Sequence, residues 1–360
     1  MRKDISYLRG VNNYMMNSKT LSKFAFATLV SIYIVIIAGS IVRSTGSGMG
    51  CPDWPKCFGY YIPPTEVEQV LWKPNKSFQK GQFIVYNEAL WSAKQDIISE
   101  QSWKPEAWEK YTKHDYAEFN VAHTWTEYLN RLSGAVSGFM CLLLLIFSFK
   151  YTKRKDLRLL SVLVLLGMVF QAWLGATVVF SVLAPHKITI HMLMALVLVA
   201  WMIIYIERLK DDNISILKVS KSMKTLIYTF FALGIVQILL GTQVRQEVDV
   251  VAKAMGEFQR PNFLNALSSR LIVHIGVAYA MLFIGLILIR NTRRNYKTVG
   301  KLITYSFICI IIGYLVGIIF RYAGFPAWAQ PVHLLISTLL FGFQFMLVFR
   351  VSKNKNILKF

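Results

Sequence analysis

The sequence is poor in charge and poor in cysteine. Charged residues make up only 16% of its 360 residues, against about 25% in an average soluble domain. Four cysteines are too few for a small secreted disulfide scaffold. Long charge-free runs, such as residues 142–149 and 302–319, exclude a disordered chain and an ordinary soluble enzyme. The sequence therefore predicts a protein that crosses a membrane several times.

Acidic residues are especially scarce. Nineteen Asp and Glu stand against 40 Lys and Arg, which gives a formal net charge of +21. Such an excess raises the question of nucleic-acid binding. We predict no nucleic-acid partner, because the basic residues form short clusters between apolar runs, as in a protein whose partner is the lipid bilayer.

Eight apolar segments are long enough to span a bilayer, which takes about 20 residues. They cover residues 24–42, 120–149, 159–182, 188–206, 225–244, 270–289, 302–320 and 331–349. Lys and Arg cluster before the first span, after the second, fourth and sixth spans, and in the tail. By the positive-inside rule, both termini are predicted to be cytoplasmic.

An internal repeat divides the chain. Gly39-Ser-Ile-Val42-Arg43 ends the first span, and Gly241-Thr-Gln-Val244-Arg245 ends the fifth. We expect an all-α membrane protein of two pseudo-symmetric four-helix bundles that run in the same direction. The predicted parts are a cytoplasmic segment 1–23, a first half 24–206 that includes an outer loop 44–119, a cytoplasmic linker 207–224, a second half 225–349 and a cytoplasmic tail 350–360.

The outer loop 44–119 carries five tryptophans. A connection of this length usually has secondary structure or a function of its own. We expect amphipathic helices that lie on the membrane surface or over a site. The alternative is an ordered lid with no chemical role.

Six histidines occur. His114 and His186 fall in predicted outer loops and are expected to be surface residues. The other four, His123, His191, His274 and His333, each begin an even-numbered span. Ionisable groups inside spans are rare and usually functional, and neutral imidazole is a common ligand of metals and of heme iron. A hydrogen-bonded core histidine is the alternative for any one of them.

The predicted depth of each histidine in the membrane separates three of the four from His123. His191, His274 and His333 each lie about one turn inside the outer boundary of their spans. His274 and His333 are predicted to face each other and to hold a bis-histidine heme. In the first half the residue at the matching depth is Asn130, and His123 lies about 10 Å farther out along the helix.

One carboxylate lies among these positions. Glu127 shares a helix face with His123 and sits one turn above Asn130. A carboxylate there is costly unless it has a role or a partner. Pairing with Arg131 is the structural alternative to catalysis.

Taken in order along eight spans, these residues resemble the heme A synthase family. The resemblance rests on Gly39-x-x-Val42-Arg43, Cys51 with Cys57, Glu127-x-x-Asn130-Arg131, Gln171…Leu174-Gly175 with Val178-Val179, His191 followed by Ala195, Gln237…Gly241-x-x-Val244-Arg245, Arg270…His274 and Gln330-x-x-His333. It implies a membrane heme-dependent oxidoreductase of the bacterial cytoplasmic membrane. Such an enzyme oxidises one methyl group of heme O to a formyl group by successive hydroxylations and so gives heme A.

The resemblance also implies residue roles. A heme B cofactor would sit on His274 and His333, and the substrate heme near His191. Glu127 would be the catalytic carboxylate. Asn130 replaces the histidine of the family's Glu-x-x-His-Arg motif, so either His123 is the second axial ligand or the substrate iron keeps an open face.

Other polar residues have alternatives as well. Arg43, Arg131, Arg245 and Arg270 lie at outer helix ends, where arginine clamps heme propionates or snorkels to lipid headgroups. Cys51 and Cys57 lie on the oxidising side, where a disulfide is expected, and the family has a cysteine pair in this loop. A redox role, a structural staple and, less favoured, metal binding remain open for the pair. Cys141 and Cys309 are expected to be apolar packing residues.

Two other functions compete with the synthase. A diheme b-type electron-transfer protein has no need of Glu127 or Asn130, and a transporter of two parallel repeats predicts charges at mid-membrane, where these spans are apolar. The synthase implies heme O as substrate, heme O synthase and cytochrome oxidase assembly factors as partners, and an electron donor that the sequence does not identify.

Overall fold

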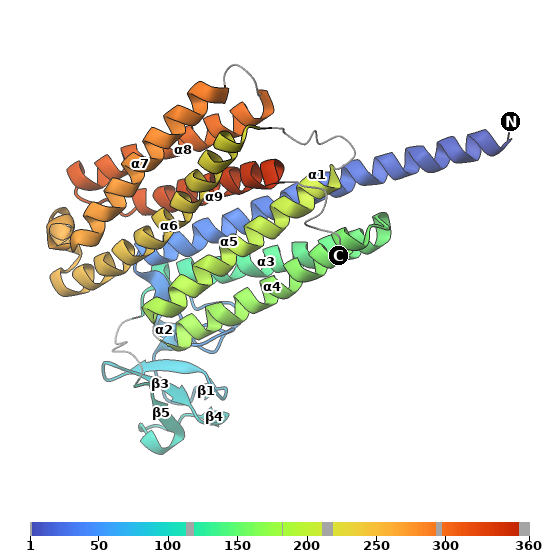
Figure 1. The fold of residues 1–360 in the computed structure, drawn as a ribbon. Helices are drawn as coiled ribbons and strands as arrows, with labels where there is room; N and C mark the ends of the chain where they lie inside the picture. The colour runs from blue at the N-terminus through green and yellow to red at the C-terminus, as the bar shows by residue number, and fades with distance from the viewer. Residues whose placement is uncertain (1, 113–118, 182, 211–218, 293–296, 353–360) are drawn as a thin grey trace. The chain divides into compact units, whose positions relative to one another are not determined.

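The structure is a computed structural model that describes residues 2–112, 119–181, 183–210, 219–292 and 297–352 (Figure 1). Among these residues, eight helices are long and apolar enough to cross a membrane, which confirms the eight predicted spans. They are α1 (Arg2–Ser44), α3 (Val121–Tyr151), α4 (Lys155–Phe180), α5 (Pro185–Leu209), α6 (Lys221–Met255), α7 (Ser269–Thr292), α8 (Lys297–Tyr322) and α9 (Ala329–Ser352).

Apolar runs of this length fold as helices because a lipid interior leaves every backbone polar group to be satisfied within the segment. Local signals set some of the ends. The Ser220 hydroxyl accepts a hydrogen bond from the Met223 N–H at 3.2 Å and caps the start of α6. Gly256 follows the end of α6 with a φ of 79°, which glycine adopts without strain. The 31 residues of α3 extend about 46 Å, which exceeds the hydrocarbon thickness of about 30 Å.

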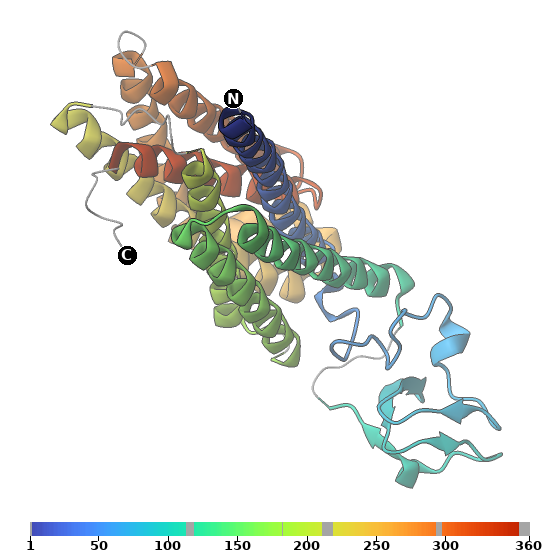
Figure 2. The ribbon, with the colours of Figure 1, turned by 90° about the vertical axis from the view of Figure 1, so that its right-hand side faces the viewer.

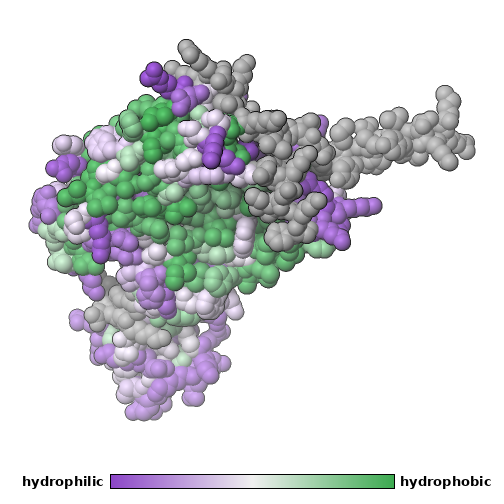
Figure 3. Space-filling model, in the orientation of Figure 1, coloured by the Kyte–Doolittle hydropathy of each residue, from purple (hydrophilic) through white to green (hydrophobic). Residues whose placement is uncertain are grey.

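The lipid-exposed surface of the helices is apolar. Figure 3 shows hydrophobic side chains, drawn in green, over the helices. Ile272 and Phe283 of α7 are 72% and 66% exposed. An apolar surface of this extent is unstable in water, and it suits lipid contact.

Two compact units divide the chain. The first contains residues 1–37, 137–169 and 192–360, and the second contains residues 38–136 and 170–191. Helices α1, α3, α4 and α5 contribute residues to both units. The predicted halves 24–206 and 225–349 remain a prediction, as does the cytoplasmic location of the termini.

Two apolar clusters build the first unit. One joins residues of α1, α3, α4 and α5, including Leu29, Leu144 and Met202. The other fills the bundle of α6, α7, α8 and α9, in which α6 contacts α7 and α9, and α8 contacts the same two helices. Glu207 of α5 is fully buried and accepts two hydrogen bonds from Arg350 of α9, at 2.7 and 2.8 Å. This ion pair ties the two clusters together.

The second unit holds the loop between α1 and α3, and here the expectation of amphipathic helices is wrong. The described residues of the loop, which exclude 113–118, include a four-residue helix, α2 (Val67–Val70), and five strands: β1 (Ser77–Phe78), β2 (Phe83–Tyr86), β3 (Ala89–Ala93), β4 (Ile97–Ile98) and β5 (Trp108–Lys110). Strands β2, β3 and β5 form one antiparallel sheet, and β1 pairs with β4. Figure 2 shows strands as arrows in the segment that connects α1 with α3.

The reason for the strands is local. Tyr86 pairs with Ala89, so β2 and β3 are joined by the two-residue turn Asn87-Glu88, in which both residues have positive φ. Such turns fix a hairpin. Four of the five tryptophans join the apolar cluster around the hairpin, in which Trp108 packs on Phe78 and Trp103 stacks on Tyr86. They therefore stabilise the loop from within.

Candidate functional site

Two histidines of the predicted second half, residues 225–349, lie close together within the first compact unit. His274 of α7 and His333 of α9 lie with their ring centres 6.3 Å apart. The Phe320 ring of α8 packs against His333 at 5.6 Å. The Nδ1 atoms of both histidines are buried without a hydrogen-bond partner among the described residues. Buried polar atoms in this state are rare and call for a partner.

The pair fits a shared heme iron. Two imidazoles bound about 2 Å from one metal ion on opposite sides of it would have ring centres about 6 Å apart. The observed 6.3 Å matches that spacing.

Helix α6 shapes the space around His274. The Gln237 amide nitrogen lies 3.3 Å from His274 Nε2. A Cβ added at Gly241 would lie 3.2 Å from His274 Cε1, so the glycine leaves room for the imidazole. The predicted Gln-x-x-x-Gly sequence thus forms one wall of the histidine's surroundings.

The first half places the glycine of the same repeated motif beside a different side chain. A Cβ added at Gly39 would lie 3.7 Å from Asn130 Oδ1. Gly39 and Gly241 occupy the same place in the repeated motif, so Asn130 stands where His274 stands in the second half. An amide replaces an imidazole at this position.

His191 of α5 lies against α4 in the second unit. The Gln171 amide donates a hydrogen bond to the His191 carbonyl oxygen at 2.9 Å. A Cβ at Gly175 would lie 3.4 Å from His191 Cε1. The Nδ1 atom of His191 is buried without a partner among the described residues. Its donor chemistry fits one axial ligand of a heme iron.

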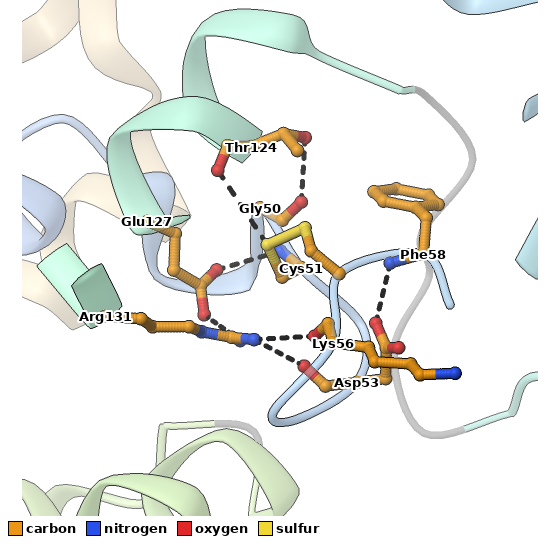
Figure 4. Close-up of polar contacts among 9 residues, drawn as sticks. Gly50, Cys51, Asp53, Lys56, Phe58, Thr124, Glu127 and Arg131 are labelled. Carbon is orange, nitrogen blue, oxygen red and sulfur yellow. Dashed lines mark hydrogen bonds and ion pairs between the residues drawn. A yellow bond between two sulfur atoms is a disulfide. The ribbon is translucent and has the colours of Figure 1, made fainter. Parts of the chain in front are cut away.

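Glu127 of α3 is a buried carboxylate in the second unit, with an exposed fraction of 3%. Its Oε1 accepts a hydrogen bond from Arg131 at 2.5 Å, and its Oε2 accepts one from the Cys51 N–H at 2.8 Å (Figure 4). The ion pair with Arg131, raised above as a structural alternative, is therefore present. Each carboxylate oxygen retains a lone pair for a further proton or hydrogen bond.

The Cys51–Cys57 disulfide is present and closes a loop against α3. This confirms the predicted disulfide bond. Gly50 brings the loop close to α3, because a Cβ at this position would lie 2.5 Å from the His123 carbonyl oxygen. The Thr124 hydroxyl donates to the Gly50 carbonyl oxygen at 2.8 Å. The loop is thus anchored to the same helix that carries Glu127.

Asp53 lies inside this disulfide loop. Its two carboxylate oxygens accept hydrogen bonds from the Phe58 N–H at 2.7 Å and the Gly59 N–H at 2.9 Å. Burial raises the pKa of the Asp53 carboxyl, although these hydrogen bonds and the nearby Arg131 act in the opposite direction. Arg131 in turn donates to the carbonyl oxygens of Asp53 and Lys56 at 2.7 and 2.8 Å.

The remaining predicted residues lie elsewhere. His123 is half-buried in the first turns of α3, where its N–H bonds to Asn120. Arg245 pairs with Asp249 at 2.6 Å, and Arg270 pairs with Glu247 at 2.8 Å. Arg43 lies in the last turn of α1. His114 falls outside the described residues, and His186 is exposed in the first turn of α5. Cys141 and Cys309 are buried free cysteines, as expected.

Sequence reasoning missed the contacts of Asp53 and Gly50. An aspartate two residues after a cysteine, within Pro-Asp-Trp-Pro, is typical of a turn in which the carboxylate accepts nearby backbone N–H groups. That signal was available. The link from this turn to Arg131, 78 residues along the chain, was not.

Comparison with known proteins identifies the family. The COX15-CtaA model, described as cytochrome oxidase assembly protein, matches residues 22–92 and 85–345. A relative from Listeria monocytogenes serovar 1/2a named heme A synthase is 22% identical over 354 residues, which cover 94% of this chain and 97% of the relative. Another of that name from Halalkalibacterium halodurans is 24% identical over 352 residues, 94% of this chain and 99% of the relative.

A third heme A synthase, from Shewanella oneidensis, is 25% identical over 188 residues, 52% of this chain and 45% of that relative. The resemblance found in the sequence is confirmed, and so is an integral, multi-pass protein of the bacterial cytoplasmic membrane. The chain belongs to the cytochrome oxidase assembly protein family.

Proposed function

We propose that the chain is a heme A synthase, a membrane oxidoreductase that oxidises a methyl group of heme O to a formyl group by successive hydroxylations. The relatives named heme A synthase, aligned over nearly the whole chain, support this reaction. The observation that carries the proposal is the inequality of the two histidine sites. The second half has a histidine pair, whereas the first half has one matched histidine, an asparagine and a buried carboxylate.

His274 and His333 would hold the resident cofactor, heme B. When bound, heme B supplies one-electron transfer. Gln237 and Gly241 would set the orientation of the His274 ring, which they contact.

His191 would bind the iron of the substrate, heme O. Asn130 supports a substrate with one protein ligand and an open face, because the amide takes the position of the second imidazole. His123 is the less favoured second ligand. It lies about two helical turns before Asn130 on α3, and Asn130 is the residue at the predicted depth of His191.

Glu127 would be the acid/base group, because replacing a C–H bond of the methyl group by a C–OH bond requires proton transfer near the reacting carbon, whichever molecule supplies the oxygen atom. Its burial excludes water, and its two fixed hydrogen bonds orient the carboxylate. Arg131 is bonded to Glu127 and to two loop carbonyls. Arg43 and Arg245, which share the repeated Gly-x-x-Val-Arg motif, would contact the propionates of the substrate and of the cofactor.

The reaction also implies partners. Heme O synthase would supply the substrate, and cytochrome oxidase and its assembly factors would receive the product. An electron-transfer partner would couple to the heme B site. The match to cytochrome oxidase assembly proteins supports this setting.

A diheme b-type electron-transfer protein is the alternative, and it is not favoured. Such a protein needs two equivalent axial pairs, and it has no need of a buried carboxylate beside one of them.

Membranes that contain the protein test the proposal when they are supplied with heme O and their pigments are separated by chromatography. We expect heme A from the wild type and from His186→Ala, whose histidine is exposed. We expect about 10²- to 10⁴-fold less from Glu127→Gln. Wild-type membranes that make no heme A would overturn the proposed function.

A further inference from the structure

We propose that Asp53 is a positioning residue for Glu127 and that it acts through the backbone of the disulfide loop and through Arg131. The proposal rests on the proposed function of Glu127 as the acid/base group. The proposal gives the Cys51–Cys57 loop a role besides that of a structural disulfide. The loop orients the Glu127 carboxylate through the Cys51 N–H and through Arg131.

Asp53 first fixes the end of the loop. Its two oxygens collect the N–H groups of Phe58 and Gly59. Gly59 has a φ of 81°, and a Cβ there would lie 2.5 Å from Gln82 Cα. Only a glycine fits this turn without displacing its neighbour. The chain therefore turns sharply after Cys57, and the Asp53 carboxylate stabilises that turn.

The folded loop then presents two carbonyl oxygens to one guanidinium nitrogen. Arg131 Nη1 donates to the carbonyls of Asp53 and Lys56 at 2.7 and 2.8 Å, which uses both of its N–H groups (Figure 4). The carbonyls come from opposite sides of the loop, so they meet at Arg131 only while the loop keeps this shape. A guanidinium held in this way has lost its rotational freedom before it meets the carboxylate.

Arg131 and the loop together orient Glu127. Arg131 Nη2 contacts Oε1, and the Cys51 N–H, from the same loop, contacts Oε2. Cys51 is fully buried, and the Arg131 side chain is 13% exposed. Both oxygens of the carboxylate are thus set by one loop, directly through a backbone N–H and indirectly through an arginine.

The substitution Asp53→Asn tests this chain of contacts with little change of shape. The amide oxygen still accepts one N–H, but the amide NH2 group is a donor and faces the second N–H. The loop end then loses one of its two hydrogen bonds, and the carbonyls no longer converge on Arg131. Asp96 is the matched control, because it is an aspartate of the same α1–α3 loop that accepts the exposed Lys80 N–H at 2.7 Å and has no such link to Arg131.

We expect Asp53→Asn to lower kcat for heme A formation about 10- to 100-fold, the order of loss that follows a small misplacement of a catalytic group. KM for heme O and the amount of bound heme B are expected to stay within about twofold of the wild type. Asp96→Asn should match the wild type.

A double-variant cycle separates positioning from general damage. Arg131→Lys removes the planar fork that links the loop to Glu127. Added to Arg131→Lys, Asp53→Asn should cost less than about twofold, whereas independent structural damage would multiply the two losses. Multiplied losses would contradict the proposal.

The outcomes also separate this proposal from the function. If the wild type makes heme A and Asp53→Asn is as fast as Asp96→Asn, positioning by Asp53 is overturned and the synthase stands. If Asp53→Asn does not assemble, Asp53→Glu replaces it: the carboxylate moves by one methylene, and the same loss of kcat is expected. Full kcat in Asp53→Glu overturns the proposal.

Discussion

Gly241 faces His274 in the second half of the chain, and Gly39 faces Asn130 in the first. The same motif, Gly-x-x-Val-Arg, thus supports an imidazole in one half and an amide in the other. The second half adds His333, 6.3 Å from His274 between ring centres. The first half adds His191 and the loop-bound Glu127.

This difference suits two different tasks. A pair of imidazoles saturates both axial positions of a heme iron and retains it as a permanent cofactor. A substrate must enter, react and leave, and a single imidazole with a nearby acid/base group is the weaker and more reactive arrangement. On the proposed function, the comparison teaches that a few side chains beside one repeated motif distinguish a cofactor site from a substrate site.

Removal of the histidine pair should have the largest effect. His274→Ala or His333→Ala leaves one axial ligand, so we expect nearly complete loss of the heme B absorbance in the reduced-minus-oxidised spectrum. His191→Ala should retain that absorbance. Equal loss in all three variants would break the distinction between the halves.

Glu127→Ala should leave the heme B spectrum intact and lower heme A formation about 10²- to 10⁴-fold. The repeat that matches Asn130 with His274 also matches Glu127 with Leu271, so Leu271→Ala is the control in the other half. It should turn over at close to the wild-type rate. Normal heme A formation by Glu127→Ala would contradict the assignment of Glu127 as the catalytic carboxylate.

Gly50→Ala tests the Cys51–Cys57 disulfide loop of the first half. The described residues of the second half contain no matching disulfide loop. The added Cβ would lie 2.5 Å from the His123 carbonyl oxygen, and overpacking of this kind costs about 1–3 kcal/mol. We expect a lower thermal unfolding midpoint and a lower kcat. Gly134→Ala is the control, because its Cβ would meet nothing within 4 Å; an equal effect of both substitutions would contradict the close approach at Gly50.

Replacement of both Cys51 and Cys57 by Ser should have a smaller effect. Closing so short a loop contributes about 2 kcal/mol in the chain-entropy description, and Asp53 still holds the loop end. We expect a partial loss of kcat, and the same partial loss when the wild type is treated with reductant. Complete loss of turnover with the fold and heme B retained would favour a redox role for the disulfide instead.

Asn130→His should have the smallest effect on the protein and a clear effect on its spectrum. The new imidazole takes the position that His274 has in the second half. With heme O bound, we expect a larger low-spin signal by electron paramagnetic resonance than in the wild type, and unchanged heme B content. An unchanged spin state would show that Asn130 does not lie at an axial position.

Much of this comparison was visible in the sequence. The spans follow from apolar runs, and the pairing of His274 with His333 follows from equal depths in helices of one repeat. The hairpin of residues 83–93 was missed because its turn, Asn87-Glu88 between two short apolar runs, lacks the glycine that usually marks a two-residue turn.

The contacts of the loop were harder to predict. The five tryptophans suggested a surface, but four of them pack together in one apolar cluster of the loop, and only Trp54 lies outside it and is exposed. The bonds from Asp53 and Lys56 to Arg131 span 78 and 75 residues, and no local pattern reports such a contact. Periodicity and motif spacing predict elements and depths, whereas the loop that orients Glu127 depends on long-range contacts.

The most direct test of unequal sites is the pigment content of the detergent-purified protein. A reduced-minus-oxidised spectrum would be followed by extraction and chromatography of the hemes. We predict about one heme B per chain, together with heme O, partly oxidised heme or heme A. Two heme B per chain and no other pigment would contradict the account and favour the electron carrier.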